Sequence, residues 1–352
     1  MKHYGLSLLN RASVPGRYSR GVNQQIVLAA RPAGFPKESD FRLVELPMPS
    51  PGEGEVLVRV KILSVDPYMR GRMNEARSYA EPVAIGAVMV GQGVGEVVQS
   101  RHPDFKTGDT VVGWFGWQQY AVAPASELRK LDPATAPPST ALGVLGMPGL
   151  TAYFGMTDIC GPKPGETAVI SGAAGAVGSI AGQIAKIRGC RAVGIAGSDE
   201  KVSHIVNDFC FDAAFNYKTT TDYSAKVKEL CPKGVDVYFD NAGGAITDAV
   251  MQRLNPLARI AICGQISQYN LEQPEVGPRP FTTLLVRQAK AQGFLVFQFA
   301  ARYREGLTQL GAWLKEGRLK YREQFADGIE NAPKAFIEML RGANAGKQLV
   351  RI

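Results

Sequence analysis

The 352-residue sequence predicts an α/β protein in which a small, mostly antiparallel β-barrel is followed by a doubly wound parallel sheet. Two observations support this fold class. Residues up to about 145 consist of short strand-like stretches separated by Gly and Pro turns, whereas the residues after them alternate between strand-like and helix-like stretches. With 45% hydrophobic and 20% charged residues, the chain also has enough apolar side chains for more than one core.

The first half contains strands with period-two patterns. The stretch "EVLVRVKILSV" (55–65) places Val56, Val58 and Val60 on one face and charged side chains on the other, as a half-buried strand does. Glycines interrupt the Val-rich stretch 86–100, which is typical of bends in a barrel. Further strands are expected in 23–32, 41–52 and 108–124.

The second half alternates between the two periodicities. Residues 165–202 read as strand, glycine turn, helix, strand and the start of another helix. More strands are predicted within 233–244, 258–267 and 291–299, and more helices within 303–317 and 329–342. A closing strand is predicted at 346–352, and the sequence pattern leaves open whether it returns to the barrel.

The net charge of +8 comes mainly from the N-terminus. Six basic residues precede the first acidic one, Glu38, and without them 34 basic residues face 32 acidic ones. This distribution argues against a nucleic-acid-binding face. Residues 1–22 read as a tail, with a transit peptide for organelle targeting, a wrongly assigned start and a disordered segment as open readings. The longest uncharged stretches contain Pro and Gly, so no membrane span is expected.

The cysteine and histidine spacing predicts no metal site. Five cysteines are scattered without a CxxC pair, and the three histidines (3, 102 and 204) form no cluster. A catalytic zinc needs at least three N, S or O ligands from the protein. We therefore expect a zinc-independent protein, and unpaired cysteines favour the cytoplasm, a reducing compartment.

A dinucleotide-binding turn is predicted at "SGAAGAVG" (171–178), between a strand and an apolar helix. Gly175 allows the backbone to approach a pyrophosphate, and Gly178 allows close packing of helix on sheet, while Ala173 takes the place of the first glycine. A lone glycine triplet is a weak signal, but the strand before it and the helix after it support it. The predicted pyrophosphate site comprises Ala173, Ala174, Gly175, Ala176, Val177 and Gly178.

The end of the next strand indicates which dinucleotide binds. An NAD enzyme has an acidic residue there for the ribose diol. In "GIAGSDEKV" that place holds Gly197 and Ser198, and Asp199 falls where a helix begins. Lys201 lies within reach of a 2′-phosphate, although an exposed helix lysine is the commoner role. Ser198 and Lys201 therefore favour NADPH.

The chain resembles the zinc-independent medium-chain dehydrogenase/reductases. The resemblance rests on "DPYMRGRM", "VLGMPGLTAYFG", "AAGAVGSIAGQIAK", "FDNAGG", "CGQISQYN" and "NAGKQLV", in that order. They are typical of the branch of prostaglandin reductases (leukotriene B4 dehydrogenases), plant enone double-bond reductases and bacterial curcumin reductase. The likeness runs from about residue 23 to the C-terminus.

This resemblance implies a Rossmann doubly wound parallel sheet plus a GroES-like β-barrel catalytic domain. The implied boundaries are a tail at 1–22, the catalytic domain at 23–145, the NADPH-binding domain at 146–315 and a return to the catalytic domain at 316–352. It also implies a homodimer and NADPH-dependent reduction of carbon–carbon double bonds conjugated to a carbonyl. Implied cofactor contacts are Tyr217 near the adenosine phosphate, Asn241, Cys263, Gly264, Ser267, Tyr269, Phe294 and Val296 on the nicotinamide side, and Asn344 closing on the cofactor.

Two tyrosines are candidate catalytic residues. Reduction of an enone needs a hydrogen-bond donor at the developing enolate oxygen, and a protonated phenol suits that role. Tyr269, placed after a parallel strand, is the first candidate, for donation or proton relay. Tyr68 follows the Asp66–Pro67 turn, where zinc-dependent relatives carry a metal ligand, and is expected to act as a pocket wall and auxiliary donor, with packing as its alternative.

The predicted substrate is therefore a small-molecule enone or alkenal, with neither nucleic acid nor membrane as partner. Two other functions stay open. An NADPH:quinone oxidoreductase uses the same fold, and a non-catalytic NADPH- or RNA-binding protein represents another class.

Overall fold

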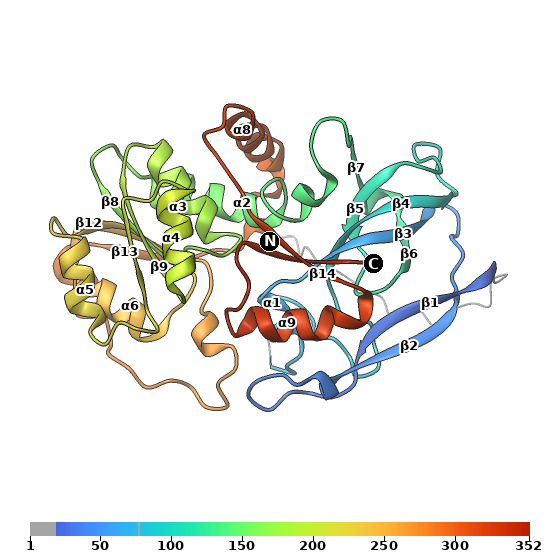
Figure 1. Ribbon diagram of the computed structural model, residues 1–352, viewed down its shortest axis with the longest axis horizontal. Helices are drawn as coiled ribbons and strands as arrows, with labels where there is room; N and C mark the ends of the chain where they lie inside the picture. Colours follow the sequence, from blue (N-terminus) through green and yellow to red (C-terminus); the bar gives the residue numbers. More distant parts are fainter. Residues whose placement is uncertain (1–18, 77) are drawn as a thin grey trace. The chain divides into compact units, whose positions relative to one another are not determined.

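The computed structural model describes residues 19–76 and 78–352 (Figure 1). Most of the predicted tail, residues 1–18, lies outside the described residues, and strand β1 (Ser19–Leu28) contains the rest. The described chain divides into two compact units. The first comprises the residues up to Pro138 with Phe325–Ile337 and Leu349–Ile352, and the second comprises Ser139–Gln324 with Glu338–Gln348. Each unit therefore includes part of the C-terminal segment.

The first unit is built from antiparallel strands. Strand β3 (Glu55–Ser64) is central, because it pairs with β4 (Gln92–Ser100), β6 (Tyr120–Pro124) and β15 (Lys347–Arg351). As predicted, Val56, Val58 and Val60 are buried and Arg59 is exposed, but Leu57 on the opposite face is buried as well. Strand β2 (Phe41–Met48) pairs with β1. The remaining strands are β5 (Thr110–Trp114), β7 (Arg129–Leu131) and β14 (Glu323–Asp327), and β14 lies next to β15.

A glycine in β4 permits the close approach of β3. A Cβ at Gly95 would lie 2.4 Å from the carbonyl oxygen of Arg59, a distance that no side chain tolerates. The register between the two strands also shifts nearby, between Val60 and Ile62. The expected role of glycines in this Val-rich stretch thus has a direct steric cause.

Short helices complete the first unit. Helix α1 (Tyr68–Arg72) begins directly after the Asp66–Pro67 step. Helix α9 (Ala332–Leu340) contributes Phe336, whose ring lies 5.9 Å from that of the fully buried Trp117. Single-turn 3-10 helices lie at Glu38–Asp40, Ala125–Glu127 and Ile329–Asn331, and a longer one begins the second unit at Pro138–Leu142.

The second unit contains a parallel sheet in the order β10-β9-β8-β11-β12-β13. This order confirms the predicted doubly wound fold, whose strand order reverses beside β8. The strands are β8 (Thr167–Ser171), β9 (Arg191–Ala196), β10 (Ala213–Asn216), β11 (Val235–Asp240), β12 (Leu254–Ile262) and β13 (Lys290–Gly293). The helices are α2 (Met147–Phe154), α3 (Gly178–Ile187), α4 (Asp199–Asn207), α5 (Tyr223–Leu230), α6 (Gly244–Met251), α7 (Phe281–Arg287) and α8 (Tyr303–Lys315).

Helices cover both faces of this sheet (Figure 1). Ala168 and Ile170 of β8 pack in one core with α3 and α4, whereas Val169 packs in a second core with α5 and α6. Consecutive strand residues thus face opposite layers, as expected for a strand buried on both sides.

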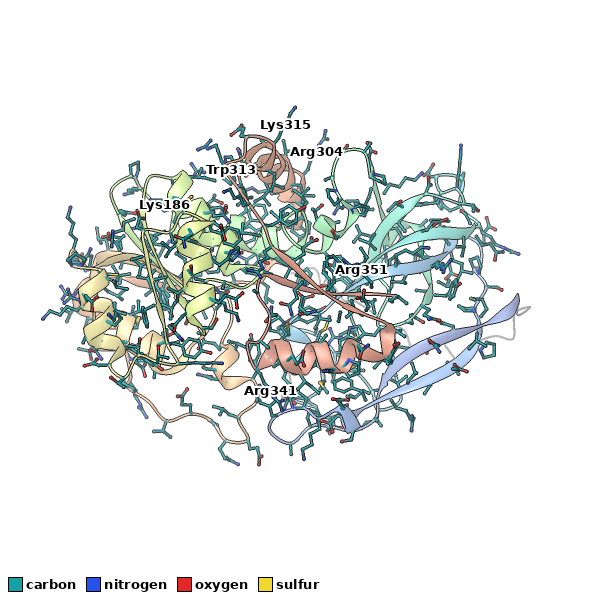
Figure 2. The ribbon with its side chains drawn as sticks, viewed as in Figure 1. Lys186, Arg304, Trp313, Lys315, Arg341 and Arg351 are labelled. Carbon is teal, nitrogen blue, oxygen red and sulfur yellow. The ribbon has the colours of Figure 1, made fainter. Side chains whose placement is uncertain are left out.

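Helix α8 lies within the helix predicted over 303–317 and is amphipathic. Trp313 is 5% exposed and its ring lies 6.0 Å from that of Tyr153. Arg304 and Lys315, on the same helix, point outward (Figure 2).

The strand predicted over 291–299 is wrong in its second half. Strand β13 ends at Gly293, and Val296–Arg302 forms a 3-10 helix. The cause is aromatic packing, because this turn of chain stacks Phe299 on Phe154 with ring centroids 4.6 Å apart. Two further short elements flank the sheet, a π-helix at Gly155–Cys160 and a 3-10 helix at Ile266–Gln268.

The contact between α3 and Phe211 makes Gly182 sensitive to substitution. A Cβ at Gly182 would lie 1.8 Å from the buried ring of Phe211. We expect Gly182→Ala to lower the free energy of unfolding by about 2 kcal/mol through overpacking. Gly311→Ala in α8 is the matched control, because a Cβ there meets nothing within 4 Å, and it should raise stability by up to about 1 kcal/mol. Thermal unfolding followed by circular dichroism checks both, and an unchanged midpoint for Gly182→Ala would contradict the packing.

Candidate cofactor and active site

The turn after β8 has the geometry of an anion-binding turn. Gly172 has φ +60°, and a Cβ at Gly178 would lie 2.3 Å from the carbonyl oxygen of Gly172. A side chain at position 178 would therefore push α3 away from the strand. Among the described residues no side chain caps the amino end of α3, an arrangement that suits an anion such as a pyrophosphate.

A segment from the C-terminal part of the chain lies against this turn. The amide of Gly346 donates to the carbonyl of Ala174 (2.9 Å), and Gly175 forms a parallel bridge with Gly346. The side chain of Asn344 donates to the carbonyl of Gly346 (2.9 Å). The structure thus brings Asn344 close to the predicted pyrophosphate residues, although about 170 positions separate them in the sequence.

The end of β9 carries a basic group instead of an acid. Ser198 is the N-cap of α4 and accepts from the amide of Lys201 (3.3 Å). The Lys201 ammonium donates to the carbonyl of Gly342 (2.6 Å), and burial, followed by the charge of Lys218, lowers its pKa. Lys201 is therefore not an exposed helix lysine, which is the commoner role of a lysine at such a position. Its basic neighbour Lys218 was missed in the sequence, although it directly follows the predicted Tyr217.

Tyr217 lies beside the same strand end. A Cβ at Gly197 would lie 3.1 Å from the Tyr217 hydroxyl, so the small residue at 197 makes room for the phenol. Burial raises the pKa of Tyr217. Together, Ser198, Lys201, Tyr217 and Lys218 form a partly enclosed, positively charged corner at the carboxyl end of β9.

The ends of β11 and β12 bring together the residues predicted for the nicotinamide side. Asn241 donates from its side chain to the carbonyl of Ser171 (2.7 Å). The amides of Cys263 and Gly264 both donate to the carbonyl of Asp240, at 2.9 and 3.1 Å. The amide of Ser267 donates to the carbonyl of Ala242 (3.0 Å), which folds this loop back over the end of β11.

Tyr269 closes the same loop. Its hydroxyl accepts from the amide of Gln265 (3.4 Å) and would lie 3.2 Å from a Cβ at Gly264. Burial is the main cause that raises the pKa of Tyr269, and the nearby Cys263 and Asp240 raise it further. The phenol thus remains protonated at neutral pH, and its own hydrogen can be donated elsewhere.

Phe294 and Val296 are used in packing. Both side chains are buried in the sheet core, where the Phe294 ring lies 6.2 Å from that of Phe239. If these two residues contact a cofactor, we therefore expect the contact to come from their backbone atoms.

Tyr68 lies in the first unit, at the start of α1. Its ring packs edge-on against Trp114, with centroids 6.3 Å apart. Its hydroxyl is buried and has no hydrogen-bond partner among the described residues. Burial, reinforced by the charge of Asp66, raises the pKa of this phenol well above its usual value. A buried donor without a partner is costly, so the geometry suits a group that meets an acceptor on a ligand.

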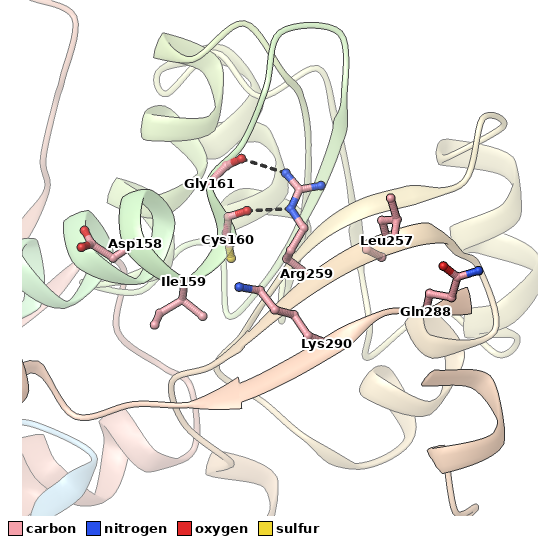
Figure 3. A pocket seen from close by; sticks show the side chains of 9 residues that line it. Asp158, Ile159, Cys160, Gly161, Leu257, Arg259, Gln288 and Lys290 are labelled. Carbon is pink, nitrogen blue, oxygen red and sulfur yellow. Dashed lines mark hydrogen bonds between the residues drawn. The ribbon is translucent and has the colours of Figure 1, made fainter. Parts of the chain in front are cut away.

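One cavity lies at the opposite end of the sheet (Figure 3). It has a volume of about 340 Å³ and lies beside Lys290, the first residue of β13, and the end of the π-helix. Arg259 is fully engaged there: it donates to the carbonyls of Cys160 (2.7 Å) and Gly161 (2.8 Å) and pairs with Glu166. The predicted site residues do not line this cavity.

The thiol of Cys263 is expected to resist alkylation. Burial, with Asp240 as the second cause, raises its pKa to about 12. Only the thiolate is nucleophilic, so below pH 12 its reactive fraction is far smaller than that of an ordinary cysteine. Iodoacetamide labelling mapped by mass spectrometry at pH 8 should modify the exposed Cys210 and leave Cys263 unmodified. Equal labelling of the two would contradict this assignment.

Two family profiles match the chain. One, described as the N-terminal domain of oxidoreductase, covers residues 24–131, and the other, described as zinc-binding dehydrogenase, covers residues 176–313. Despite the second description, no three His, Cys, Asp or Glu residues within 19–76 and 78–352 lie together as a metal site would require.

Individual relatives match over nearly the whole chain. The NADPH-dependent curcumin reductase of Escherichia coli (strain K12) is 46% identical, covering 94% of this chain and 97% of its own. The NADP(+)-dependent 2-alkenal reductase of Nicotiana tabacum is 43% identical, with the same coverage of 94% and 97%. The crystal structure of CurA from Vibrio vulnificus in complex with NADPH has a TM-score of 0.90 and 46% identity, covering 93% of this chain and 98% of that one. The chain therefore belongs to the medium-chain dehydrogenase/reductase family, and within it to the zinc-independent branch of double-bond reductases.

Proposed function

We propose that this protein is an NADPH-dependent reductase of the carbon–carbon double bond of α,β-unsaturated ketones and aldehydes. One observation carries the proposal. A protonated phenol, Tyr269, lies at the carboxyl end of the parallel sheet with its hydrogen available, in a chain 46% identical to a curcumin reductase.

The geometry of the second unit supports an assignment of the cofactor residues. The turn from Ala173 to Gly178 holds the pyrophosphate at the amino end of α3. Ser198, Lys201 and Tyr217 hold the 2′-phosphate, and Lys218 adds to the positive charge there. The nicotinamide lies against Asn241, Cys263, Gly264, Ser267, Tyr269 and the backbone of Phe294 and Val296, with Asn344 closing near the pyrophosphate.

The chemistry divides between cofactor and protein. When bound, NADPH supplies the hydride for the β-carbon of the substrate. Tyr269 donates its hydrogen bond to the carbonyl oxygen, on which negative charge develops. Because the hydroxyl already accepts from Gln265, its hydrogen points away from that amide. A proton from this phenol or from water then adds to the α-carbon.

Tyr68 is proposed as an auxiliary donor and pocket wall. Its buried hydroxyl lacks a partner in the part of the chain that the structure describes, so an acceptor on the substrate would satisfy it. The Trp114 ring beside it offers an apolar surface.

Turnover of different acceptors tests the reaction class. NADPH oxidation is followed against enones, alkenals, quinones and saturated ketones, with the products identified by mass spectrometry. We expect enones and alkenals to be reduced to saturated carbonyl compounds. Quinones as the preferred acceptors would favour the quinone oxidoreductase alternative, and NADPH binding without any turnover would favour a non-catalytic role.

Tyr269→Phe removes the proposed donor and keeps the ring. We expect kcat on enones to fall by about 100-fold, the size that loss of one such donor produces, while the Kd of NADPH stays within twofold. Tyr321→Phe, on a partly exposed tyrosine, serves as the control. An unchanged kcat for Tyr269→Phe would rule out its role as donor.

Lys201→Ala tests the choice of cofactor. Loss of one charged hydrogen bond to a phosphate should raise the KM for NADPH by about 10- to 100-fold and leave the KM for NADH unchanged. Lys226→Ala, on the exposed side of α5, controls for general loss of charge. Equal effects of Lys201→Ala on both cofactors would contradict a 2′-phosphate contact.

A homodimer is proposed from the edge of the parallel sheet. Strand β13 pairs only with β12 among the described strands, and all four of its residues are exposed. The neighbouring α7 exposes Phe281 (75%) and Leu285 (77%) to solvent. An open edge flanked by apolar side chains favours pairing with the same edge of a second copy about a two-fold axis.

Light scattering coupled to size-exclusion chromatography checks the homodimer. Wild type is expected at twice the mass of one chain, and Leu285→Lys at the mass of one chain. Leu43→Lys, on the exposed face of β2, should remain dimeric. A wild-type protein that elutes at the mass of one chain at micromolar concentration would refute the dimer.

We propose the cytoplasm as the place of action, since all five cysteines are unpaired and such thiols persist in a reducing compartment. In the described residues no helix is long and apolar enough to cross a bilayer.

A further inference from the structure

Asp240 is a buried carboxylate at the carboxyl end of β11, with 1% of its surface exposed. Its Oδ1 accepts from the hydroxyls of Ser171 (3.0 Å) and Tyr238 (2.9 Å) and from the amides of Ala242 and Gly243 (both 3.0 Å). These donors can only be satisfied by an oxygen that accepts, as both oxygens of an ionised carboxylate do.

The second oxygen is engaged in the same way. Oδ2 accepts from the Thr247 hydroxyl (2.8 Å) and from the side-chain amide of Gln265 (2.8 Å). Donors therefore come from β8, from β11 and the turn after it, from α6 and from the loop after β12. The carboxylate holds these segments together at the sheet end where the nicotinamide is proposed to bind.

Among the described residues, the charge of Asp240 has no cationic partner. No Lys or Arg of the described residues forms an ion pair with it, and six neutral donors stabilise it instead. Its field reaches the proposed nicotinamide side, because it raises the pKa of both Cys263 and Tyr269. A negative charge in a site of low dielectric constant favours a positive charge nearby.

We propose that Asp240 is a positioning residue that acts electrostatically on the cofactor, favouring the oxidised, positively charged nicotinamide over the reduced, neutral ring. This inference rests on the proposed function. Hydride donation breaks a carbon–hydrogen bond of the ring, sends its electron pair to the substrate β-carbon and leaves the ring with one positive charge. The fixed carboxylate stabilises that product charge and therefore promotes hydride release, without touching the substrate.

The test compares two substitutions that neutralise the charge with two that keep it. Asp240→Asn preserves shape, since the Thr247 hydroxyl can accept from the new amide and the Gln265 amide can turn. Gln265→Lys keeps Asp240 and places an ammonium against it, at a half-buried position. Thr247→Val and Gln265→Met each remove one hydrogen bond to Asp240 and leave its charge in place.

The readout is the ratio of the Kd of NADP+ to the Kd of NADPH, measured by calorimetric and fluorescence titration. We expect Asp240→Asn and Gln265→Lys to raise this ratio about tenfold, the size of effect that a unit charge several ångströms away has at an intermediate effective dielectric constant. Thr247→Val and Gln265→Met should leave it within twofold of wild type.

The outcomes separate this inference from the proposed function. Failure of wild type to bind either form of the cofactor overturns the proposed function and this inference with it. Binding of both forms with an unchanged ratio in the two neutralising variants overturns the inference alone, as does an equal shift in the two variants that keep the charge. If Asp240→Asn does not fold, the comparison of Gln265→Lys with Gln265→Met decides.

Discussion

Six hydrogen bonds to the carboxylate of Asp240 hold the candidate site together. A parallel sheet brings its strand ends to one edge, but it does not fix the loops that leave them. Here the buried charge of Asp240 fixes these loops, because a buried carboxylate is costly unless neighbouring donors form hydrogen bonds to it. Asn241 and Cys263 directly follow strands whose ends this carboxylate connects, and Tyr269 lies in the loop after the second of them.

The cofactor site depends on backbone approach as much as on side chains. The glycine at 178 lets α3 begin close to the strand, and Gly346 lays a distant segment against the same turn. Lys201 donates to Gly342 of that segment. The proposed 2′-phosphate corner and the proposed pyrophosphate turn are thus connected through a single segment of backbone, so we expect that occupation of one influences the order of the other.

Local patterns in the sequence predicted much of this arrangement. The alternation of strand-like and helix-like stretches predicted the parallel sheet, and Asp199 was expected to begin a helix, as it does in α4. The resemblance to the family supplied Tyr269 and Asn344. Local patterns could not predict contacts between residues far apart in the sequence, such as Lys201 and Gly342, which lie 141 positions apart. Nor did any local pattern show that Asp240 would be buried without a cation among the described residues. The wrong strand end after Gly293 has the same origin, since Phe299 turns to stack on a ring far away in the sequence.

The proposed function depends on transfer of hydride to the β-carbon of a conjugated carbonyl compound. The most direct test uses NADPH carrying deuterium at the transferred position, with an enone as substrate and the product analysed by nuclear magnetic resonance. We expect deuterium on the β-carbon and an intact carbonyl group. Deuterium on a carbinol carbon, with the double bond retained, would contradict it.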